Sequence, residues 1–327
     1  MRWLACLVLL FGSTAQADWQ RSQWDVMGTR ATLEFWRDTP AVAHNGIDPV
    51  EQSIRDEFAR INQLLSPWIA DSELAQVNDR AAQHAVTIST EFMQLLQRSK
   101  YYYRLTNGAF DASFASAGAL YDYRAAHQPD DAQLEKARAC IGFDFVRLEQ
   151  DSVRFTCNGV RLDLGGIAKG YAIDRAVSLL REQGISHAYV SLGGDSYVLG
   201  DRQGRPWQVG IRHPRDASAV AMRVPVSDIA VSTSGDYERF FIADGERVHH
   251  IINPSTGKSS QGLVSVTILA PQGMDADALS TSVFVMGRKR GLELINRLDN
   301  VSAIIIDDAG GVHYSDDLVS PEDAGDR

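Results

Sequence analysis

The chain has 327 residues, of which 42 are acidic and 32 are basic, so its formal net charge is −10. This charge, together with the lack of a basic stretch interleaved with aromatic residues, argues against nucleic acid as a partner. No segment after residue 17 is apolar enough to span a bilayer, so we expect no transmembrane segment in the mature chain.

The first 17 residues have the pattern of a secretory signal peptide. Arg2 supplies the positive charge, residues 3–11 supply a short apolar core, and Ala15 and Ala17 form a small-x-small cleavage signature. The apolar core is short for a membrane span, although a retained anchor is the alternative. Cys6 stands at the start of the apolar run, whereas a lipoprotein cysteine is expected after it. We therefore expect a mature, unlipidated protein that begins at residue 18 and is periplasmic.

A strand and a helix are predicted first in the mature chain. The strand covers residues 24–36, and three of its residues alternate on one face: Ala31, Leu33 and Phe35. The helix begins at Pro49, because Asp48 precedes it as an N-cap and an acid follows at Glu51. Apolar residues then recur at helical spacing until Ser66-Pro67, where the helix should end: Ile54, Phe58, Ile61 and Leu65.

A second helix should start near Ser89 and end by Asn107-Gly108, with its inward residues at Phe92, Leu95 and Leu96. From Phe145 onward the pattern changes to strands. Residues 160–164 predict a strand and the glycine pair a loop. A helix follows, with one face marked by Ile173, Ala176, Val177 and Leu180 and its end capped by Gly184, and residues 188–192 predict another strand. This order places a glycine pair between a strand end and a helix start.

The rest of the chain predicts short strands joined by turns, two helices at residues 276–286 and 288–298, and a last strand at residues 301–307. Residues 315–327 are polar and acidic, and we expect them to form a loose tail. There is no repeat and no linker rich in Pro, Gly or Ser. Residues 18–314 therefore predict one compact α+β domain.

Two cysteines, Cys140 and Cys157, follow the predicted signal peptide. In an oxidising compartment they could close a disulfide around a hairpin-like segment. Alternatively, they are two buried thiols that act as small apolar residues. The sequence leaves both possibilities open, because it does not supply the geometry.

The glycine pair Gly165-Gly166 is the first candidate site. Backbone N–H groups at a helix start favour an anion, and a phosphate is a natural occupant. The spacing fits neither standard nucleotide fingerprint, so a tight turn is the alternative. Lys169 in the first helical turn favours a ligand, because a lysine avoids a positive helix end unless an anion or acid is near.

The stretch "DADALSTS" is the second candidate. A helix would place Asp277 and Thr281 on one face, and a carboxylate with a hydroxyl suits magnesium. The alternative is an acid that stabilises the helix dipole, with a threonine beneath it. In "HHIINPSTG", neighbouring histidines of a strand face opposite ways, so they cannot both bind one metal from regular β geometry. One of them is a candidate proton acceptor.

These stretches belong to a series of short motifs that follow one another along the chain. "MGT", "SPW", "TNGAFD", "LDLGGIAKGYAID", "GGD", "STSGDYERFF", "HHIINPSTG" and "DADALST" follow one another from Met27 to about Leu298. In this order they resemble the FAD:protein FMN transferases, the ApbE-like flavin transferases. The glycine-lysine stretch and the Asp-Ala-Leu-x-Thr stretch are specific in combination.

The resemblance implies a T-fold-like α+β architecture with the flavin nucleotide in a cleft. It also implies FAD as substrate, Mg2+ as cofactor, and transfer of FMN to a threonine or serine of a partner protein. The implied nucleotide-site residues are Met27, Trp68, Ala109, Phe110, Asp111, Asp163, Lys169 and Ile252. The implied metal ligands are the Gly166 carbonyl and the side chains of Asp277 and Thr281, with Ser280 nearby. His250 is our candidate for the catalytic base.

The sequence departs from the family pattern at several places. Asn253 stands where many relatives carry aspartate, and the segment after Asp111 lacks the commoner proline. No Ser/Thr-Gly-Ala-Ser/Thr acceptor segment occurs in the chain, so we expect it to modify another protein. Two other functions remain as alternatives: a pyrophosphatase that splits FAD into FMN and AMP, and a non-catalytic flavin carrier.

Overall fold

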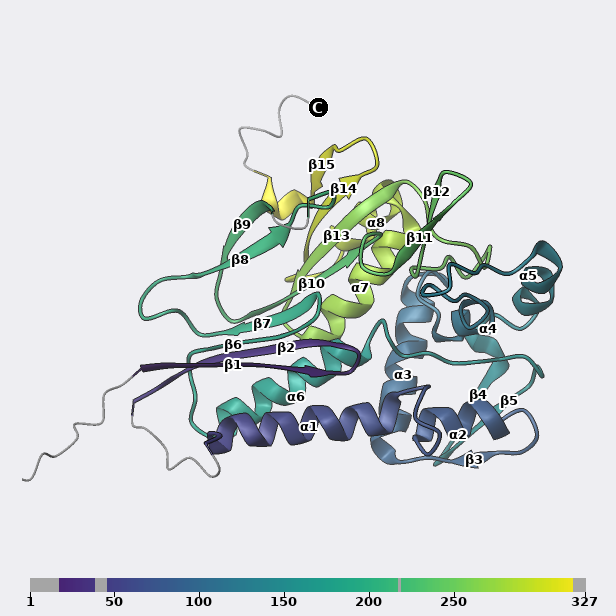
Figure 1. The fold of residues 1–327 in the computed structure, drawn as a ribbon, viewed down its shortest axis with the longest axis horizontal. Coiled ribbons are helices and arrows are strands. Elements are labelled where there is room, and N and C mark those ends of the chain that lie inside the picture. Colours follow the sequence, from purple (N-terminus) through teal and green to yellow (C-terminus); the bar gives the residue numbers. More distant parts are fainter. Residues whose placement is uncertain (1–17, 39–45, 217–218, 320–327) are drawn as a thin grey trace, which may run out of the picture.

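A large antiparallel sheet organises the computed structural model, which describes residues 18–38, 46–216 and 219–319 (Figure 1). The predicted signal peptide, residues 1–17, lies outside the described residues. Eight strands are hydrogen-bonded in the order β1-β2-β6-β7-β10-β13-β14-β15, and every neighbouring pair is antiparallel. Their bounds are β1 Asp18–Val26, β2 Thr29–Arg37, β6 Ala188–Leu192, β7 Asp195–Leu199, β10 Ile229–Gly235, β13 Leu263–Ala270, β14 Ser302–Asp307 and β15 Val312–Tyr314.

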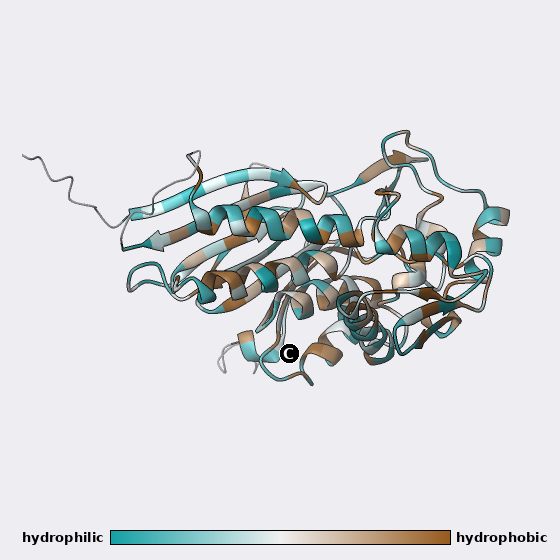
Figure 2. Ribbon diagram, turned by 90° about the horizontal axis from the view of Figure 1, so that it is seen from below, coloured by the Kyte–Doolittle hydropathy of each residue, from teal (hydrophilic) through white to brown (hydrophobic). Residues whose placement is uncertain are grey.

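Four helices cover one face of this sheet: α1 Pro49–Leu65, α6 Ala168–Glu182, α7 Gly273–Met286 and α8 Arg288–Ile295 (Figure 1). Hydrophilic and hydrophobic residues alternate along the helices in Figure 2, as expected where one side of a helix packs on the sheet. Among the described residues, no helix has both the length and the apolar character needed to cross a membrane.

A two-stranded hairpin, β8 Trp207–Arg212 and β9 Val220–Val226, packs against the second face of the sheet. Trp207, Ile211 and Val226 of the hairpin form a small apolar core with Val198 and Val231 of the sheet. The sheet is therefore apolar on both faces in its central strands. β13 shows this most clearly, since all eight of its residues are buried.

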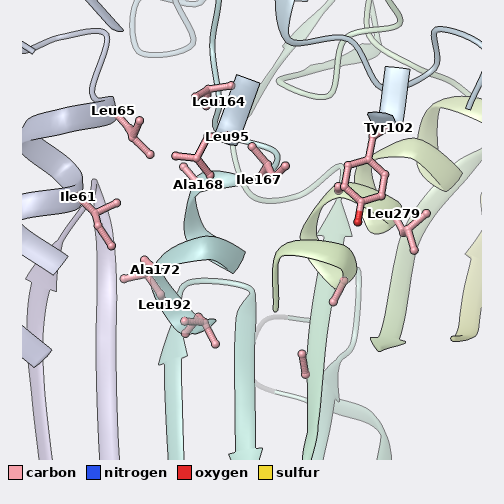
Figure 3. Packing of buried hydrophobic residues seen from close by; sticks show 14 of the residues in the cluster. Ile61, Leu65, Leu95, Tyr102, Leu164, Ile167, Ala168, Ala172, Leu192 and Leu279 are labelled. Atoms are coloured by element: carbon pink, nitrogen blue, oxygen red, sulfur yellow. The ribbon is translucent and has the colours of Figure 1, made fainter. Parts of the chain in front are cut away.

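A second hairpin consists of β11 Phe240–Ala243 and β12 Glu246–His249. Most of the other elements form a helical part beyond one end of the sheet (Figure 1). They are α2 Glu73–Arg80, β3 Val86–Thr87, α3 Thr90–Leu105, η1 Ala112–Phe114, α4 Ala115–Gly118, α5 Asp131–Arg138, η2 Phe143–Phe145, β4 Val146–Glu149 and β5 Ser152–Phe155. Leu95 and Tyr102 of α3 lie beside Leu164, Ile167 and Leu279 in one continuous core (Figure 3). Helices and antiparallel sheets thus form one compact unit, and the α+β prediction is confirmed.

The predicted helices α1, α3 and α6 are confirmed, with local sequence as the cause. The Asp48 side chain accepts a hydrogen bond from the Val50 N–H, and the Ser89 side chain caps α3 in the same way. Gly184, with a φ of 75°, follows α6 and allows the left-handed turn that ends it. These ends depend on neighbouring residues alone, which is why the sequence predicts them.

Three predicted elements differ. The single strand predicted at residues 24–36 is divided by a turn at Met27-Gly28, so its first residues end β1 and the others form β2. The strand predicted at residues 160–164 is wrong: its residues are alternately buried, but Leu162 exchanges backbone hydrogen bonds with the Asn78 side chain, at 2.7 and 2.9 Å, rather than with a strand. Helix α7 begins at Gly273, three residues before the predicted start, because Asp174 accepts hydrogen bonds from its first N–H groups.

The start of the predicted loose tail is attached to the sheet. Ser315 is fully buried, its Oγ accepts a hydrogen bond from the Ala303 N–H at 2.9 Å, and η3 covers Asp316–Leu318. Residues 320–327 lie outside the described residues. The domain therefore extends a few residues beyond the predicted boundary at 314.

The structure joins Cys140 and Cys157 in a disulfide, with their Cα atoms 5.6 Å apart. Cys140 follows α5 and Cys157 follows β5. Of the two possibilities left open by the sequence, the structure has the disulfide, which ties α5 to the small sheet of β3, β4 and β5.

Two turns and the end of β10 meet at the edge of the sheet that faces the helical part. The β1–β2 turn at Met27-Gly28 and the β6–β7 turn at Gly193-Gly194 share this edge, because Ala31 pairs with Leu192. Ser232 of β10 pairs with Asp195, so the last residues of β10 reach the same edge. The glycine pair and the start of α6 lie there as well.

Candidate active site

The site is built on a close crossing of α6 and α7. A Cβ atom on Gly170 would lie 2.2 Å from the Gly273 carbonyl oxygen, so only glycine allows the two backbones to approach this far. Asp174 fixes the crossing, since its carboxylate accepts hydrogen bonds from the N–H groups of Gly273 and Met274 at 2.6 and 2.9 Å. As a result, the first turn of α6 lies against the first two turns of α7.

Lys169 on α6 forms a buried ion cluster with two carboxylates. Its ammonium group contacts Asp195, at the start of β7, and both carboxylate oxygens of Asp277 on α7, the latter at 3.3 Å. Asp195 and Asp277 are each 3% exposed. Asp277 also accepts a hydrogen bond from the Gly170 N–H at 3.0 Å. The expected acids near Lys169 are therefore two side chains of the protein itself.

The cluster carries one more negative than positive charge when all three groups are ionised. Burial and the neighbouring Asp195 carboxylate raise the pKa of Asp277 to about 7. Burial lowers the pKa of Lys169, but the attraction of Asp195 and Asp277 outweighs it, so the net direction is upward. A buried excess of negative charge is costly, and a further cation would relieve it.

A row of hydroxyl groups extends from this cluster across α7 and β10. Ser232 donates to Asp195, and its Oγ lies 3.1 Å from the Oγ of Ser280. Ser234 lies 2.8 Å from the Oγ of Ser280 and 3.4 Å from the Oγ1 of Thr281. Thr281 follows Asp277 by one helical turn, so the two lie on one face of α7, and the Thr281 hydroxyl lies near Ser234 at the end of β10.

Gly166 passes between Phe110 and Thr281. A Cβ atom on Gly166 would lie 3.3 Å from the Phe110 ring and 3.3 Å from the Thr281 Oγ1. The backbone of the glycine pair therefore lies directly against the hydroxyl predicted to bind the metal. This close approach explains why residue 166 is a glycine better than a tight turn alone does.

The donors brought together here fit a magnesium ion. The Asp277 carboxylate, the Thr281 hydroxyl and the Gly166 carbonyl are oxygen ligands, which is the chemistry that magnesium prefers. Within residues 18–38, 46–216 and 219–319, no group of three or more His, Cys, Asp and Glu side chains could hold a metal. Magnesium suits such an incomplete set, because it usually takes its other ligands from water and substrate phosphates.

The other acids of the predicted nucleotide site bond to backbone. Asp163 accepts a hydrogen bond from the Gly165 N–H at 2.6 Å and so shapes the glycine turn. Asp111 accepts from the N–H and the hydroxyl of Ser113, at 2.8 and 2.7 Å, and burial raises its pKa to about 6. Asp111 thus caps η1, while its neighbour Phe110 points its ring at Gly166.

The two histidines have different surroundings. His249 is 3% exposed, and its Nε2 lies 2.8 Å from the Ser260 carbonyl oxygen. The buried Nδ1 of His250 has no hydrogen-bond partner among the described residues. Burial, followed by the nearby charge of Arg239, lowers the pKa of His250 to about 3. His250 is therefore neutral near pH 7, and none of the described residues forms a hydrogen bond with its Nδ1.

The remaining predicted residues are more scattered. Met27, with a φ of 51°, lies in the β1–β2 turn, and Ala109 precedes Phe110 in the turn after α3. Ile252 is 4% exposed and pairs with Ser259 in an isolated bridge. Trp68 follows α1 and is 87% exposed, and its indole makes no hydrogen bond or ring contact with another described residue. An exposed indole of this kind is available to a ligand.

The sequence predicts no role for Asp195, Ser232 or Ser234. Asp195 lies in "SLGGDSYVLG", where glycine followed by aspartate is typical of a turn, and the two serines lie in "STSGDYERFF". One signal was present: Ser232 and Ser234 alternate along a strand and so share a face. Nothing local indicates that this face meets α7, because the pairing depends on contacts far apart in the chain.

Comparison with known proteins is consistent with this geometry. The ApbE family matches residues 27–305. An FAD:protein FMN transferase of Vibrio cholerae is 30% identical, over 97% of this chain and 97% of its own. The FAD:protein FMN transferase of Treponema pallidum is 34% identical, and the match covers 86% of this chain and 82% of the Treponema pallidum protein.

Solved structures have the same fold. The crystal structure of the ApbE protein from Thermotoga maritima has a TM-score of 0.83 and 31% identity, and the match covers 92% of this chain and 98% of that one. The structure of flavin transferase ApbE from Vibrio cholerae has a TM-score of 0.80 and 27% identity, and the match covers 91% of this chain and 96% of that one. The resemblance inferred from the motifs is confirmed.

Proposed function

The chain belongs to the ApbE family, and from this we propose that it is an enzyme that transfers FMN from FAD to a threonine or serine hydroxyl of a partner protein, with release of AMP. The observation that carries the proposal is the buried cluster of Lys169, Asp195 and Asp277 beside the glycine pair. A cluster with excess negative charge, next to backbone that a side chain would block, suits a metal-bound pyrophosphate.

Magnesium would be held by Asp277, Thr281 and the Gly166 carbonyl, with Ser280 close by. When bound, the ion would offset the charge that builds on the phosphates as the bond to AMP stretches. Lys169 keeps Asp195 and Asp277 in place and limits the negative charge of the empty site. The glycine pair leaves room for phosphate oxygens next to the backbone.

His250 is the proposed base for the attacking hydroxyl. The hydroxyl oxygen forms a bond to the FMN-side phosphorus, its proton passes to the free ring nitrogen, and the bond from that phosphorus to the AMP oxygen breaks. The electron pair of the broken bond stays on AMP. The product is a phosphoester between FMN and the acceptor, so atoms and charge balance without a redox step.

The flavin nucleotide would lie between the turns at this edge of the sheet. Met27, Trp68, Ala109, Phe110, Asp111, Asp163, Lys169 and Ile252 are its proposed neighbours. The ring of Phe110 against Gly166 and the exposed indole of Trp68 support this arrangement most directly. An indole offers a flat apolar face on which an isoalloxazine ring can stack.

Chromatography of the nucleotides tests the reaction against its two alternatives. Purified protein is incubated with FAD and magnesium, with and without an acceptor domain that carries a Thr-Gly-Ala-type segment. The proposal predicts that AMP appears with the acceptor and that free FMN does not accumulate. Equal amounts of free FMN and AMP, with unmodified acceptor, would support a pyrophosphatase, and intact bound FAD would support a carrier.

We also propose that the protein acts in the periplasm after removal of residues 1–17. The disulfide between Cys140 and Cys157 supports an oxidising compartment. N-terminal sequencing of exported protein should find Asp18 first. An intact Met1, or lipid on Cys6, would contradict this.

A further inference from the structure

Arg239 lies beside the site without a role in the cluster described above. It follows β10 and precedes β11 (Phe240–Ala243), and its carbonyl oxygen accepts a hydrogen bond from the His250 N–H at 3.1 Å. Its guanidinium nitrogen Nη2 lies 3.7 Å from the position a Cβ atom on Gly28 would occupy. The side chain thus reaches from a backbone that is hydrogen-bonded to His250 to the β1–β2 turn that carries Met27.

The guanidinium of Arg239 has no hydrogen bond and no ion pair with any residue that the structure describes. Other arginines of this region are paired: Arg212 with Glu238 at 2.5 Å, Arg215 with Asp236 at 2.7 Å and Arg247 with Asp236 at 3.5 Å. Because Arg239 is also exposed, its charge and its donors are available to a ligand from solution.

The charge of Arg239 acts on the site. It lowers the pKa of His250, after the larger effect of burial, and it opposes the rise that burial causes in the pKa of Asp163. Lys169 differs, since its charge is taken up by two buried carboxylates. Arg239, in contrast, has no carboxylate partner in the part of the chain that the structure describes, so its charge is free for an anion.

We propose that Arg239 binds a phosphate oxygen of the nucleotide donor, and that Lys169 instead neutralises the protein's own carboxylates. This inference rests on the proposed function for the identity of the donor. A planar guanidinium donates two parallel hydrogen bonds to a phosphate, which fixes its orientation. Placed near both Met27 and His250, such a contact would hold the reacting phosphate between the flavin and the base.

Binding of FAD and of riboflavin to the metal-free protein tests the inference. The proteins are wild type, Arg239→Gln, and Arg212→Gln as a matched control that loses a paired surface arginine next to the same loop. Titrations in EDTA are followed by flavin fluorescence. Arg239→Gln should weaken FAD binding on the order of 10- to 100-fold, as for loss of a hydrogen bond to a charged group. Riboflavin has no phosphate, so its binding should be unchanged.

Two further measurements separate a binding role from a structural one. Arg239→Gln should unfold at the wild-type temperature, because the guanidinium has no partner among the described residues. Arg239→Lys should bind FAD more tightly than Arg239→Gln but less tightly than wild type, since lysine keeps the charge but cannot donate two parallel hydrogen bonds. Wild-type FAD affinity in Arg239→Gln, an equal loss for riboflavin, or a large drop in unfolding temperature would overturn the inference.

A different result would contradict the proposed transfer of FMN. Wild-type protein saturated with FAD that modifies no acceptor would contradict transfer, while a phosphate-dependent loss of affinity in Arg239→Gln would still support the contact.

Discussion

Helix α6 has a charge cluster on each side, and each cluster holds a cation between two carboxylates. On the inner side, Lys169 lies between Asp195 and Asp277. On the outer side, Arg60 of α1 lies between Glu57 and Glu91, at 2.8 and 2.7 Å. Helix α6 joins the outer cluster through two side chains, Tyr171 to Glu91 and Arg175 to Glu57.

Burial separates the two clusters. The inner carboxylates are each 4% exposed at their side chains, whereas Glu57 and Glu91 are 12% and 26% exposed, and Lys169 is 29% exposed against 45% for Arg60. In the outer cluster, hydrogen bonds from Arg60 lower the pKa of Glu57 to about 2, so the ion pairs are satisfied. In the inner cluster, burial and Asp195 raise the pKa of Asp277 to about 7. One cation with two carboxylates therefore stabilises the fold in the outer cluster. In the buried inner cluster, the same combination leaves an excess negative charge that a further cation would neutralise.

The largest expected effect is on transfer activity. Asp277→Ala removes the only carboxylate among the proposed metal ligands, and we expect magnesium-dependent transfer to fall by at least about 1,000-fold, since a metal contributes several kcal/mol to such a step. Transfer is measured from the mass of the acceptor.

Glu57→Gln is the matched control for Asp277→Ala, because it changes an acid of the outer cluster. It should keep near-normal activity. Equal losses in the two variants would show that the inner cluster has no special part in the reaction.

Removal of the cation from each cluster should change stability by different amounts. Lys169→Met leaves two buried carboxylates without their partner and should lower the free energy of unfolding by about 3–5 kcal/mol. Arg60→Met breaks exposed ion pairs and should cost about 1 kcal/mol or less. Urea unfolding at pH 7 measures both. Similar values would mean that the inner cluster is hydrated and behaves like the outer one.

His250 tests whether the interior also supplies the base. His250→Ala should lower the rate of transfer by about 100-fold, the lower range for loss of a general base. Because the pKa of His250 is about 3, the wild-type rate should show no loss from histidine protonation between pH 5 and 8. An acid limb near pH 6.5 that disappears in His250→Ala would contradict the buried, neutral imidazole.

The smallest expected effect is the pH dependence of the outer cluster. The pKa of Glu57 is about 2 in the folded protein against 4.5 for the free group, so its contribution to stability is present above pH 4.5 and is lost as the pH falls toward 2. Arg60→Gln should remove about 1 kcal/mol of this contribution. Urea unfolding of both proteins at pH 3 and pH 6 should therefore show a larger difference at pH 6. A constant difference would argue against the linkage.

The sequence predicts the parts of the fold that depend on near neighbours. Asp48-Pro49 begins α1, Ser89 begins α3, and the apolar face of α6 follows from its spacing. The short helices α2 and α5 were not predicted, although Asp130 and Gln133 form a capping box at the start of α5. With two buried residues in α2 and one in α5, these helices have too little apolar periodicity to be distinguished from turns.

The site was predictable where one helix carries both residues. Asp277 and Thr281 share a face of α7 by their spacing alone. The approach of Asp195 to Lys169 depends on the antiparallel order of the sheet and on the crossing at Gly170, and neither follows from local sequence. The same reason applies to Arg239, whose side chain reaches a turn more than 200 positions away in the chain.

The mass of the acceptor protein after reaction tests the central claim most directly. An acceptor domain with a Thr-Gly-Ala-type segment is incubated with the protein, FAD and magnesium, and then analysed by intact and tandem mass spectrometry. The account predicts a gain of one FMN, linked by a phosphoester to a single threonine or serine, and no gain with EDTA or with FMN as the sole donor. An acceptor that stays unmodified with FAD and magnesium, or that is modified equally well from FMN, would contradict it.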